Sequence, residues 1–313
     1  MKPAPSLLVF TVGSGAGLGL LVWLVIGRLF GAALSGLVFG VAGAIALGLL
    51  AIGLLSSTLH LANRRNAWRA MSGWRHSWLA REAIAAITVW PLAGVWLWAA
   101  FANRLMVEWI AGLLLLVAAL ATVWCTAMIY ACLRTVPRWH CWQTRAGYPL
   151  YALVSGGLIW WALATVDQSD RMQALERVRS LLTLLLALAA VIKFSHWKRF
   201  AERRPAAITV AQAIGVPGRA RLFDAGHTGP TFLTREFGFQ LDAHRAVGLR
   251  WIALALSFVL PAVLIGWPVS SSLAVGMALA APIVCLTGLL LERWLFFAEA
   301  EHVVRLYHGA GHV

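Results

Sequence analysis

The chain has 313 residues, of which 61% are hydrophobic and 12% are charged, and its mean hydropathy is +0.78. A soluble domain carries about 25% charged residues, roughly twice this share. The composition therefore excludes a soluble enzyme, a secreted disulfide scaffold and a disordered chain. It predicts an all-α, polytopic integral membrane protein that lies almost entirely in or at the bilayer.

The chain carries a formal net charge of +14. So basic a chain can indicate nucleic-acid binding, but basic residues of membrane proteins gather in cytoplasmic loops and contact lipid headgroups. We therefore expect membrane lipid, and no nucleic acid, as the partner of these charges. The four cysteines form no CxxC motif, so we expect no metal site, iron–sulfur cluster or molybdenum in this chain itself.

Eight apolar segments are long enough to cross about 30 Å of hydrocarbon. Because a helix satisfies its own backbone hydrogen bonds in lipid, they predict one membrane domain, residues 1–313, built as a bundle of eight transmembrane helices. The predicted spans are residues 6–26, 33–60, 83–103, 109–133, 148–166, 181–200, 247–267 and 272–297. An even number of spans places both termini on the same side.

Glycines recur at short intervals in the first two predicted spans, at Gly13, Gly15, Gly17, Gly19, Gly36, Gly40 and Gly43. The run GSGAGLG is similar to a nucleotide-binding loop, but it lies within a span, follows no strand and does not fit GxGxxG. Small residues four apart let two helix backbones approach closely. We therefore interpret these glycines as helix-packing positions.

The basic residues outside the spans are distributed unequally between the two sides. One side has five: Arg28, Arg104, Arg171, Arg177 and Arg179. The other side has 19: Lys2, Arg64, Arg65, Arg69, Arg75, Arg81, Arg134, Arg138, Arg145, Lys198, Arg199, Arg203, Arg204, Arg219, Arg221, Arg235, Arg245, Arg250 and Arg305. The positive-inside rule predicts that this second side, with both termini, is cytoplasmic. In a bacterium the membrane would be the inner membrane.

The segment between the second and third spans, Ser57 to Glu82, alternates arginines with tryptophans at helical spacing. This pattern indicates an interfacial helix, with tryptophans toward the headgroups and arginines toward water or a partner. His60 ends one span and Glu82 opens the next, so both are expected at the same membrane level, at the water boundary. An aromatic belt with an ordinary basic loop is the alternative explanation.

Few ionisable residues lie within the predicted spans. Away from the span ends, only Lys193, Glu292 and Arg293 are expected in the hydrocarbon, and all three are near the basic side. Ion-coupled transporters usually place carboxylates or histidines at mid-depth, so this pattern disfavours a transporter. Histidine pairs for two haems are absent, but His60 and His196 lie at span ends on one side and leave a single-haem cytochrome b open as an alternative.

Three stretches carry a resemblance to a known family: HLANRRNAWRAMSGWRHSWLARE from His60, ATVWCTAMIYACLRTVPRWH from Ala121 and FDAGHTGPTFLTREFGF from Phe223. FFAEAEHVVRLYHG near the carboxyl end is a weaker fourth. The chain resembles the membrane anchor subunit of the dimethyl sulfoxide reductase family, and more closely the variant that serves cytoplasmic sulfite dehydrogenases. It departs from the family pattern at residues 62–65, ANRR, where a glycine and an acidic or proline-containing turn are expected.

The resemblance implies an anchor in a three-subunit molybdopterin oxidoreductase. A molybdopterin catalytic subunit handles the substrate, a subunit with four [4Fe–4S] clusters carries electrons, and the anchor exchanges them with an exchangeable quinone, with no haem of its own. The family's quinone-site histidine and glutamate match His60 and Glu82, which would hydrogen-bond the quinone and relay its protons. Arg81 and Trp78 are candidates to line the same pocket, although packing explains them equally well.

The placement on the cytoplasmic side favours sulfite oxidation with reduction of quinone. The alternative is the anchor of a dimethyl sulfoxide reductase, which oxidises quinol. The long sixth loop, from Lys198 to Arg250, is basic and exceeds an ordinary connection. We expect it to dock the iron–sulfur subunit, and the candidate docking residues are Arg75, His227, Thr228, Phe232, Arg235 and Phe237.

Overall fold

The computed structural model describes residues 3–32, 34–59, 64–167, 172–202, 209–220, 223–224, 229, 239, 241–266 and 273–308. This part of the chain is predominantly helical. Eight of its helices are long and apolar enough to cross a membrane, which confirms the predicted number of spans. The chain is therefore a multi-pass membrane protein.

The elements follow one another along the chain as α1 (Pro5–Leu29), α2 (Gly36–Leu59), η1 (Arg64–Gly73), α3 (Trp78–Phe101), α4 (Leu105–Ala131), α5 (Trp142–Val166), α6 (Met172–Glu202), α7 (Val210–Ala213), α9 (Ala243–Leu254), η3 (Ala255–Val259), α10 (Leu260–Ile265), α11 (Ala274–Ala298) and η4 (Val303–His308). The elements α9, η3 and α10 follow one another without a break and form the seventh span.

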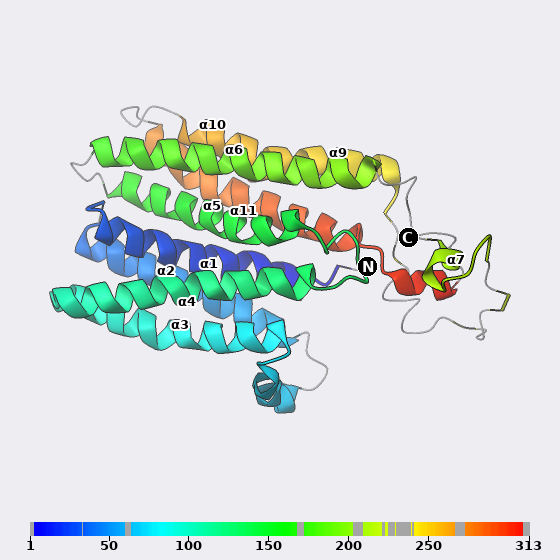
Figure 1. The fold of residues 1–313 in the computed structure, drawn as a ribbon. Helices are drawn as coiled ribbons and strands as arrows, with labels where there is room; N and C mark the ends of the chain where they lie inside the picture. Colours follow the sequence, from blue (N-terminus) through cyan, green and yellow to red (C-terminus); the bar gives the residue numbers. More distant parts are fainter. Residues whose placement is uncertain are drawn as a thin grey trace.

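The spans lie side by side, and α1 and α5 form the centre of the bundle (Figure 1). In each of these two helices 78% of the apolar window is buried, more than in any other described span. Helix α2 packs on α1, α3 packs on α4, and α6 and α11 pack on α5. The seventh span covers α11.

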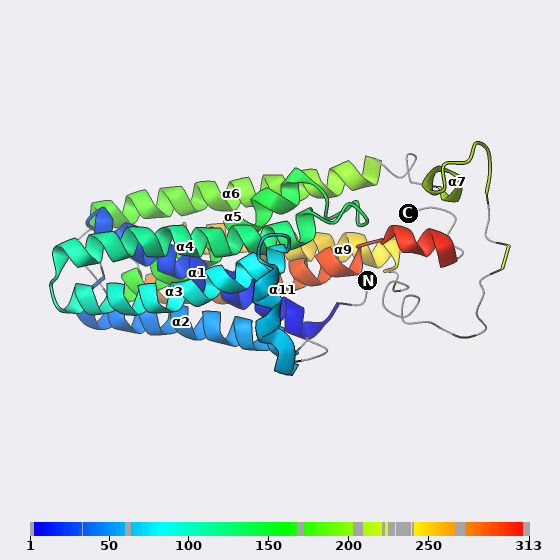
Figure 2. The ribbon, with the colours of Figure 1, turned by 60° about the horizontal axis from the view of Figure 1, so that its bottom comes forward.

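The start of α1, η1, α7 and η4 all lie at one end of the bundle, as the two views show together (Figures 1 and 2). We call this the basic end, because most of the arginines outside the spans were predicted there. It also holds the last turns of α4, α6 and α11 and the first turns of α3 and α5. The side of the membrane that this end faces stays a prediction.

Close backbone contacts explain several of the glycines in α1 and α2. A Cβ atom on Gly17 would lie 2.5 Å from the carbonyl oxygen of Ala46 in α2, and one on Gly19 would lie 1.8 Å from that of Ala152 in α5. Only glycine permits these approaches, so the helix-packing interpretation is confirmed there. It is wrong for Gly36, where an added Cβ would meet nothing within 4 Å.

Several helices begin earlier than hydropathy predicted. Helix α3 starts at Trp78 instead of residue 83, because the side chain of Ser77 caps it by accepting a hydrogen bond from the Ala80 N–H at 3.3 Å. Helix α5 starts at Trp142 instead of residue 148. Hydropathy detects the apolar length of a span, whereas polar first turns remain helical outside the hydrocarbon.

The seventh span contains a π-helical segment, η3. Pro261 has no N–H, and its ring would clash with a carbonyl one turn earlier in a regular α-helix. The chain widens there, and the Leu260 N–H bonds the carbonyl of Ala255, five residues back. The widened turn brings Ser257 against Gly288 of α11, where an added Cβ would lie 2.3 Å from the Ser257 nitrogen.

Candidate functional site

The predicted interfacial helix is present as a 3-10 helix, η1, at the basic end of α2 and α3. Trp68 and Trp74 are 64% and 51% exposed, as expected for side chains that meet headgroups. The predicted helical pattern does not continue unbroken to Glu82, because a turn separates η1 from α3. Trp78 therefore belongs to α3.

Arg81 closes the turn between η1 and α3. Its Nε donates to the carbonyl of Trp74 at 2.8 Å, and its Nη2 donates to the carbonyl of Arg75 at 2.7 Å. Its guanidinium also lies over the Trp78 ring, 4.4 Å from the centroid. These contacts give Arg81 and Trp78 a structural role, because they fix the turn that joins η1 to α3.

Glu82 faces away from this turn and into the bundle. It is only 4% exposed, and its carboxyl group is hydrogen-bonded to the hydroxyl of Thr126 on α4. Glu82 is therefore covered by the bundle instead of open to water, and its depth in the membrane stays a prediction. Successive residues of a helix point about 100° apart, so the position after the outward-facing Arg81 is turned toward α4.

Thr126 can pair with Glu82 in either protonation state. Its hydroxyl also lies 3.1 Å from the carbonyl oxygen of Thr122, yet a hydroxyl has a single proton to donate. When Glu82 is ionised, Thr126 donates to the carboxylate. When Glu82 is protonated, it donates to Thr126, which then donates to the Thr122 carbonyl. A hydroxyl with these two arrangements is suited to relay a proton.

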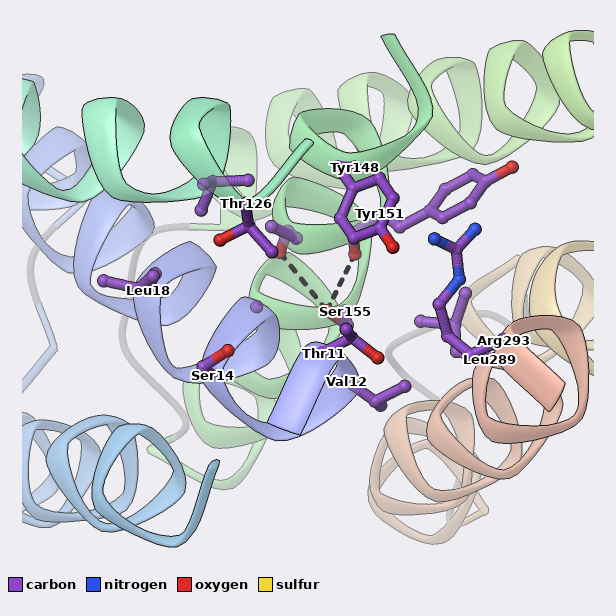
Figure 3. Close-up of a pocket in the computed structure, with 13 residues that line it drawn as sticks. Thr11, Val12, Ser14, Leu18, Thr126, Tyr148, Tyr151, Ser155, Leu289 and Arg293 are labelled. Carbon is purple, nitrogen blue, oxygen red and sulfur yellow. Dashed lines mark hydrogen bonds between the residues drawn. The ribbon is translucent and has the colours of Figure 1, made fainter. Parts of the chain in front are cut away.

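Thr126 also lines a cavity of about 30 Å³ among α1, α4, α5 and α11 (Figure 3). Its polar lining consists of the side chains of Thr11, Ser14, Thr126, Tyr148, Tyr151, Ser155 and Arg293. This volume holds about two water molecules, whereas a known cavity that binds benzene measures about 150 Å³. The cavity is therefore sized for water and is too small for a quinone ring.

A buried charged cluster forms the α11 side of this region. It consists of Lys193 of α6 with Glu292 and Arg293 of α11, which are 3%, 0% and 5% exposed. The Glu292 carboxylate pairs with both cations, which leaves one net positive charge. Arg293 points toward Tyr148 and Tyr151 of α5 (Figure 3), and its guanidinium lies 4.4 Å from the Tyr148 ring centroid.

Sequence reasoning found the three charged residues of this cluster but missed that they form one site. Their positions near the ends of two apolar spans were the available signal. A span that carries buried charge must offer it a partner. The identity of that partner depends on how α6 and α11 pack, and hydropathy does not report it. Thr126 and the two tyrosines carried no such signal.

His196 of α6 is also buried, at 5% exposure, and its Nε2 lies 2.9 Å from the carbonyl oxygen of Arg138. The single-haem alternative requires His196 and His60 as axial ligands. His60, which is also the predicted quinone ligand, lies outside the described residues. The haem alternative is therefore untested.

The predicted docking residues are also largely outside the described part of the chain. Arg75 is exposed beside η1, where a partner can reach it. The remaining candidates lie outside the described residues: His227, Thr228, Phe232, Arg235 and Phe237. The docking surface stays a prediction.

Comparison with known proteins identifies the family. The family model described as DMSO reductase anchor subunit (DmsC) matches residues 1–298. The chain is 34% identical over 328 residues to a sulfite dehydrogenase subunit of Allochromatium vinosum, and the match covers 98% of this chain and 99% of that protein. The resemblance noted in the sequence is thereby confirmed, and the chain belongs to the family of DMSO reductase anchor subunits.

Proposed function

We propose that this chain anchors a three-subunit molybdopterin oxidoreductase in the bacterial inner membrane and passes electrons between an iron–sulfur subunit and quinone. Membership in the anchor family and similarity to a sulfite dehydrogenase subunit along nearly the whole chain support this role. The partners are a subunit with four [4Fe–4S] clusters and a molybdopterin catalytic subunit. They dock at the basic end, where Arg75 and α7 lie.

The quinone site is proposed at the corner where α2, η1 and α3 meet. The observation that carries this proposal is the burial of the Glu82 carboxyl group beside this corner. This carboxyl group is hydrogen-bonded to the hydroxyl of Thr126, which lines the water-sized cavity. Because that cavity is too small for the ring, we place the ring outside it, between α2 and α3 at the η1 end. His60 completes the site on sequence grounds.

The packing of α2 and α3 supports access from lipid at this corner. Helix α2 packs along α1 and α3 along α4, while α2 and α3 have few contacts with each other. Phe39 of α2 meets Trp96 and Phe101 of α3 at the end far from η1. We therefore place the proposed entry of the lipid-soluble ring at the opposite end, between α2 and α3 next to η1.

Quinone reduction requires the protein to supply protons to the quinone oxygens. A quinone that accepts two electrons from the iron–sulfur subunit also binds two protons, one on each carbonyl oxygen, and becomes a quinol. Glu82 gives a proton to a quinone oxygen and is reprotonated, and the Thr126 hydroxyl stays hydrogen-bonded in both states. His60, which titrates near neutral pH when unperturbed, is suited to serve the other oxygen.

Sulfite is the proposed electron donor, because the relative is named as part of a sulfite dehydrogenase. Sulfite and water yield sulfate, two electrons and two protons, and the electrons pass to quinone. The family description favours one alternative, a dimethyl sulfoxide reductase anchor. In that enzyme the same site would oxidise quinol, and the electrons would pass from quinol to the substrate.

The test is the replacement Glu82→Gln in the complete complex. We expect sulfite-dependent reduction of decylubiquinone to fall on the order of 10²-fold, the usual contribution of a positioned acid or base. Reduction of ferricyanide, which takes electrons before the quinone step, should be unchanged. Glu301→Gln, an exposed glutamate at the same end, is the control and should behave as wild type.

Wild-type kinetics with decylubiquinone in the Glu82→Gln complex would refute the role of Glu82. His60→Ala tests the second residue in the same pair of assays. Oxidation of a quinol by dimethyl sulfoxide, together with no sulfite-dependent reduction of ferricyanide, would replace the sulfite assignment by its alternative and leave the quinone site in place.

A further inference from the structure

A second, smaller cavity lies next to the first. It measures about 10 Å³, which holds about one water molecule. Arg293 and Tyr151 line both cavities and therefore separate them. Lys193 and His196 of α6 and Gln143 of α5 also line the smaller one. The larger cavity borders Thr126, so the two together extend from α4 to α6 across the basic end of the bundle.

Buried polar atoms beside both cavities lack an aligned hydrogen-bond partner among the described residues. At the smaller cavity these are Oε1 of Gln143 and Nδ1 of His196, and at the larger one the hydroxyl of Tyr148. Their residues are 6%, 5% and 5% exposed. Buried polar groups in proteins are nearly always hydrogen-bonded, and ordered water serves those that protein atoms do not. Each cavity is thus a built site for water.

The contacts of His196 determine its tautomer. Nε2 lies 2.9 Å from the Arg138 carbonyl oxygen, and a carbonyl can only accept, so Nε2 carries a proton. In a neutral imidazole Nδ1 then has a free lone pair. His196 therefore offers a proton acceptor to the smaller cavity and donates toward the loop between α4 and α5.

On its other side His196 adjoins ion pairs at the basic end. Arg138 lies 3.5 Å from Glu299, which also pairs with Arg250 at 2.6 Å. The arginine side chains of these pairs are 18% and 22% exposed, so they reach the surface. His196 thus stands between the small cavity and groups in contact with water.

We propose that water in these two cavities, together with His196 and Thr126, carries protons between the basic end of the bundle and Glu82. This inference rests on the quinone role proposed for Glu82. It assigns Nδ1 of His196 as the atom that exchanges a proton with the smaller cavity, while Nε2 keeps its own proton on the Arg138 carbonyl, and it assigns Thr126 as the last relay before Glu82. Lys193 and Arg293 line the route, and Glu292 pairs with both of them.

The buried charges suit such a route. Lys193, Glu292 and Arg293 together leave one net positive charge, which an ionised Glu82 balances. A positive charge beside the water keeps an excess proton from resting in the cavities, and the ionised Glu82 carboxylate at the far end supplies the attraction that draws the proton through. The described polar contact of Glu82 is with Thr126, and Thr126 leads to the larger cavity.

The experiment uses His196→Gln in the complete complex, because glutamine can donate to the Arg138 carbonyl but does not titrate. We expect the kcat for decylubiquinone reduction by sulfite to fall about ten-fold or more, with an unchanged KM for decylubiquinone and an unchanged rate with ferricyanide. The solvent deuterium isotope effect on kcat should increase. His140→Gln, an exposed histidine whose Nδ1 also meets a carbonyl oxygen, at 2.7 Å, is the matched control and should match wild type.

Thr126→Val gives a second reading, with Thr126→Ser as the variant that keeps the hydroxyl. We expect valine to slow turnover like His196→Gln and serine to restore most of it. The double variant should be no slower than the slower single variant, since both changes interrupt one route.

Wild-type turnover and isotope effect in both His196→Gln and Thr126→Val, with Glu82→Gln still slow, would overturn the route and leave the quinone site intact. Fast turnover in Glu82→Gln would instead refute the quinone site itself. A raised KM for decylubiquinone in His196→Gln, with kcat unchanged, would also contradict the inference, because it would place His196 in quinone binding.

Discussion

The two ends of the bundle differ in how their buried acidic and basic side chains are paired. At the end away from η1, Arg28 and Glu108 form a two-pronged pair between α1 and α4, with Nε–Oε1 at 2.7 Å and Nη2–Oε2 at 3.0 Å. Each carboxylate oxygen has its own donor, and Arg28 keeps contact with the surface at 28% exposure. Nearby, Ser35 donates its N–H to Asp167 at 2.8 Å.

At the basic end the buried cations outnumber their carboxylate partners. Two cations share Glu292, and polar atoms without aligned partners among the described residues border two water-sized cavities. A matched pair completes its own hydrogen bonds and joins two helices. A cluster whose buried polar atoms lack partners costs stability, and such a cost is typical of groups that have a functional role. The comparison therefore separates a structural ion pair from a candidate site.

The largest expected effect comes from Glu292→Gln, which leaves Lys193 and Arg293 buried without their anion. Breaking a buried ion pair by removing one partner costs about 3–5 kcal/mol. The equivalent change at the other end, Glu108→Gln, should cost about 1–2 kcal/mol, since Arg28 can turn toward water. SDS titration of the purified anchor in mixed micelles measures both losses of unfolding free energy.

An equal loss for the two variants would remove the energetic distinction between the ends. Glu176→Gln, at the start of α6 in an exposed pair with Arg179, is the baseline for a surface pair. It should change the unfolding free energy by less than about 1 kcal/mol.

A smaller effect is expected from Arg28→Lys. Lysine keeps the charge but replaces the two-pronged contact with Glu108 by a single one. We expect a loss of about 1 kcal/mol in the same titration, with quinone reduction unchanged. Arg104→Lys, at an exposed position of the same end, should have no effect. A larger loss of quinone reduction than of stability in Arg28→Lys would show that this end also takes part in turnover.

The smallest effect concerns His302, which precedes η4 outside the spans. Its Nδ1 accepts the Val304 N–H at 3.0 Å, and burial lowers its pKa below the usual 6.5. The folded state thus binds the proton less readily than the unfolded one. The stability that this cap contributes is present above about pH 6.5 and is lost as the pH falls through the lowered pKa.

Hydrogen exchange measured by mass spectrometry, corrected for the intrinsic pH dependence, should show η4 losing protection as the pH falls below about 6.5. His302→Asn keeps a capping oxygen that does not titrate, so its protection should not depend on pH in this range. The same pH dependence in both proteins would mean that another group governs η4.

Much of this architecture could be predicted from the residues alone. Spans of about twenty apolar residues determine eight transmembrane helices, since no other open structure satisfies its backbone in lipid. Gly17 and Gly19 predicted close packing, and the Trp- and Arg-rich stretch predicted an interfacial helix and carried the family resemblance. These features are local, so each can be recognised within one segment of the chain.

The direction of Glu82 and the composition of the site were decided by tertiary structure. Residues of α1, α4, α5, α6 and α11 form the two cavities, and their positions in the chain range from Thr11 to Phe296. Hydropathy says that a helix crosses the membrane but not which face meets which neighbour. Thr126 and Tyr148 are inconspicuous in sequence, and the sequence marked His196 only as a possible haem ligand. The packing that places these residues beside Glu82 and the two cavities made them candidates for proton transfer. The reason is physical: a span is specified by its own residues, whereas a cavity and its charge balance depend on several helices at once.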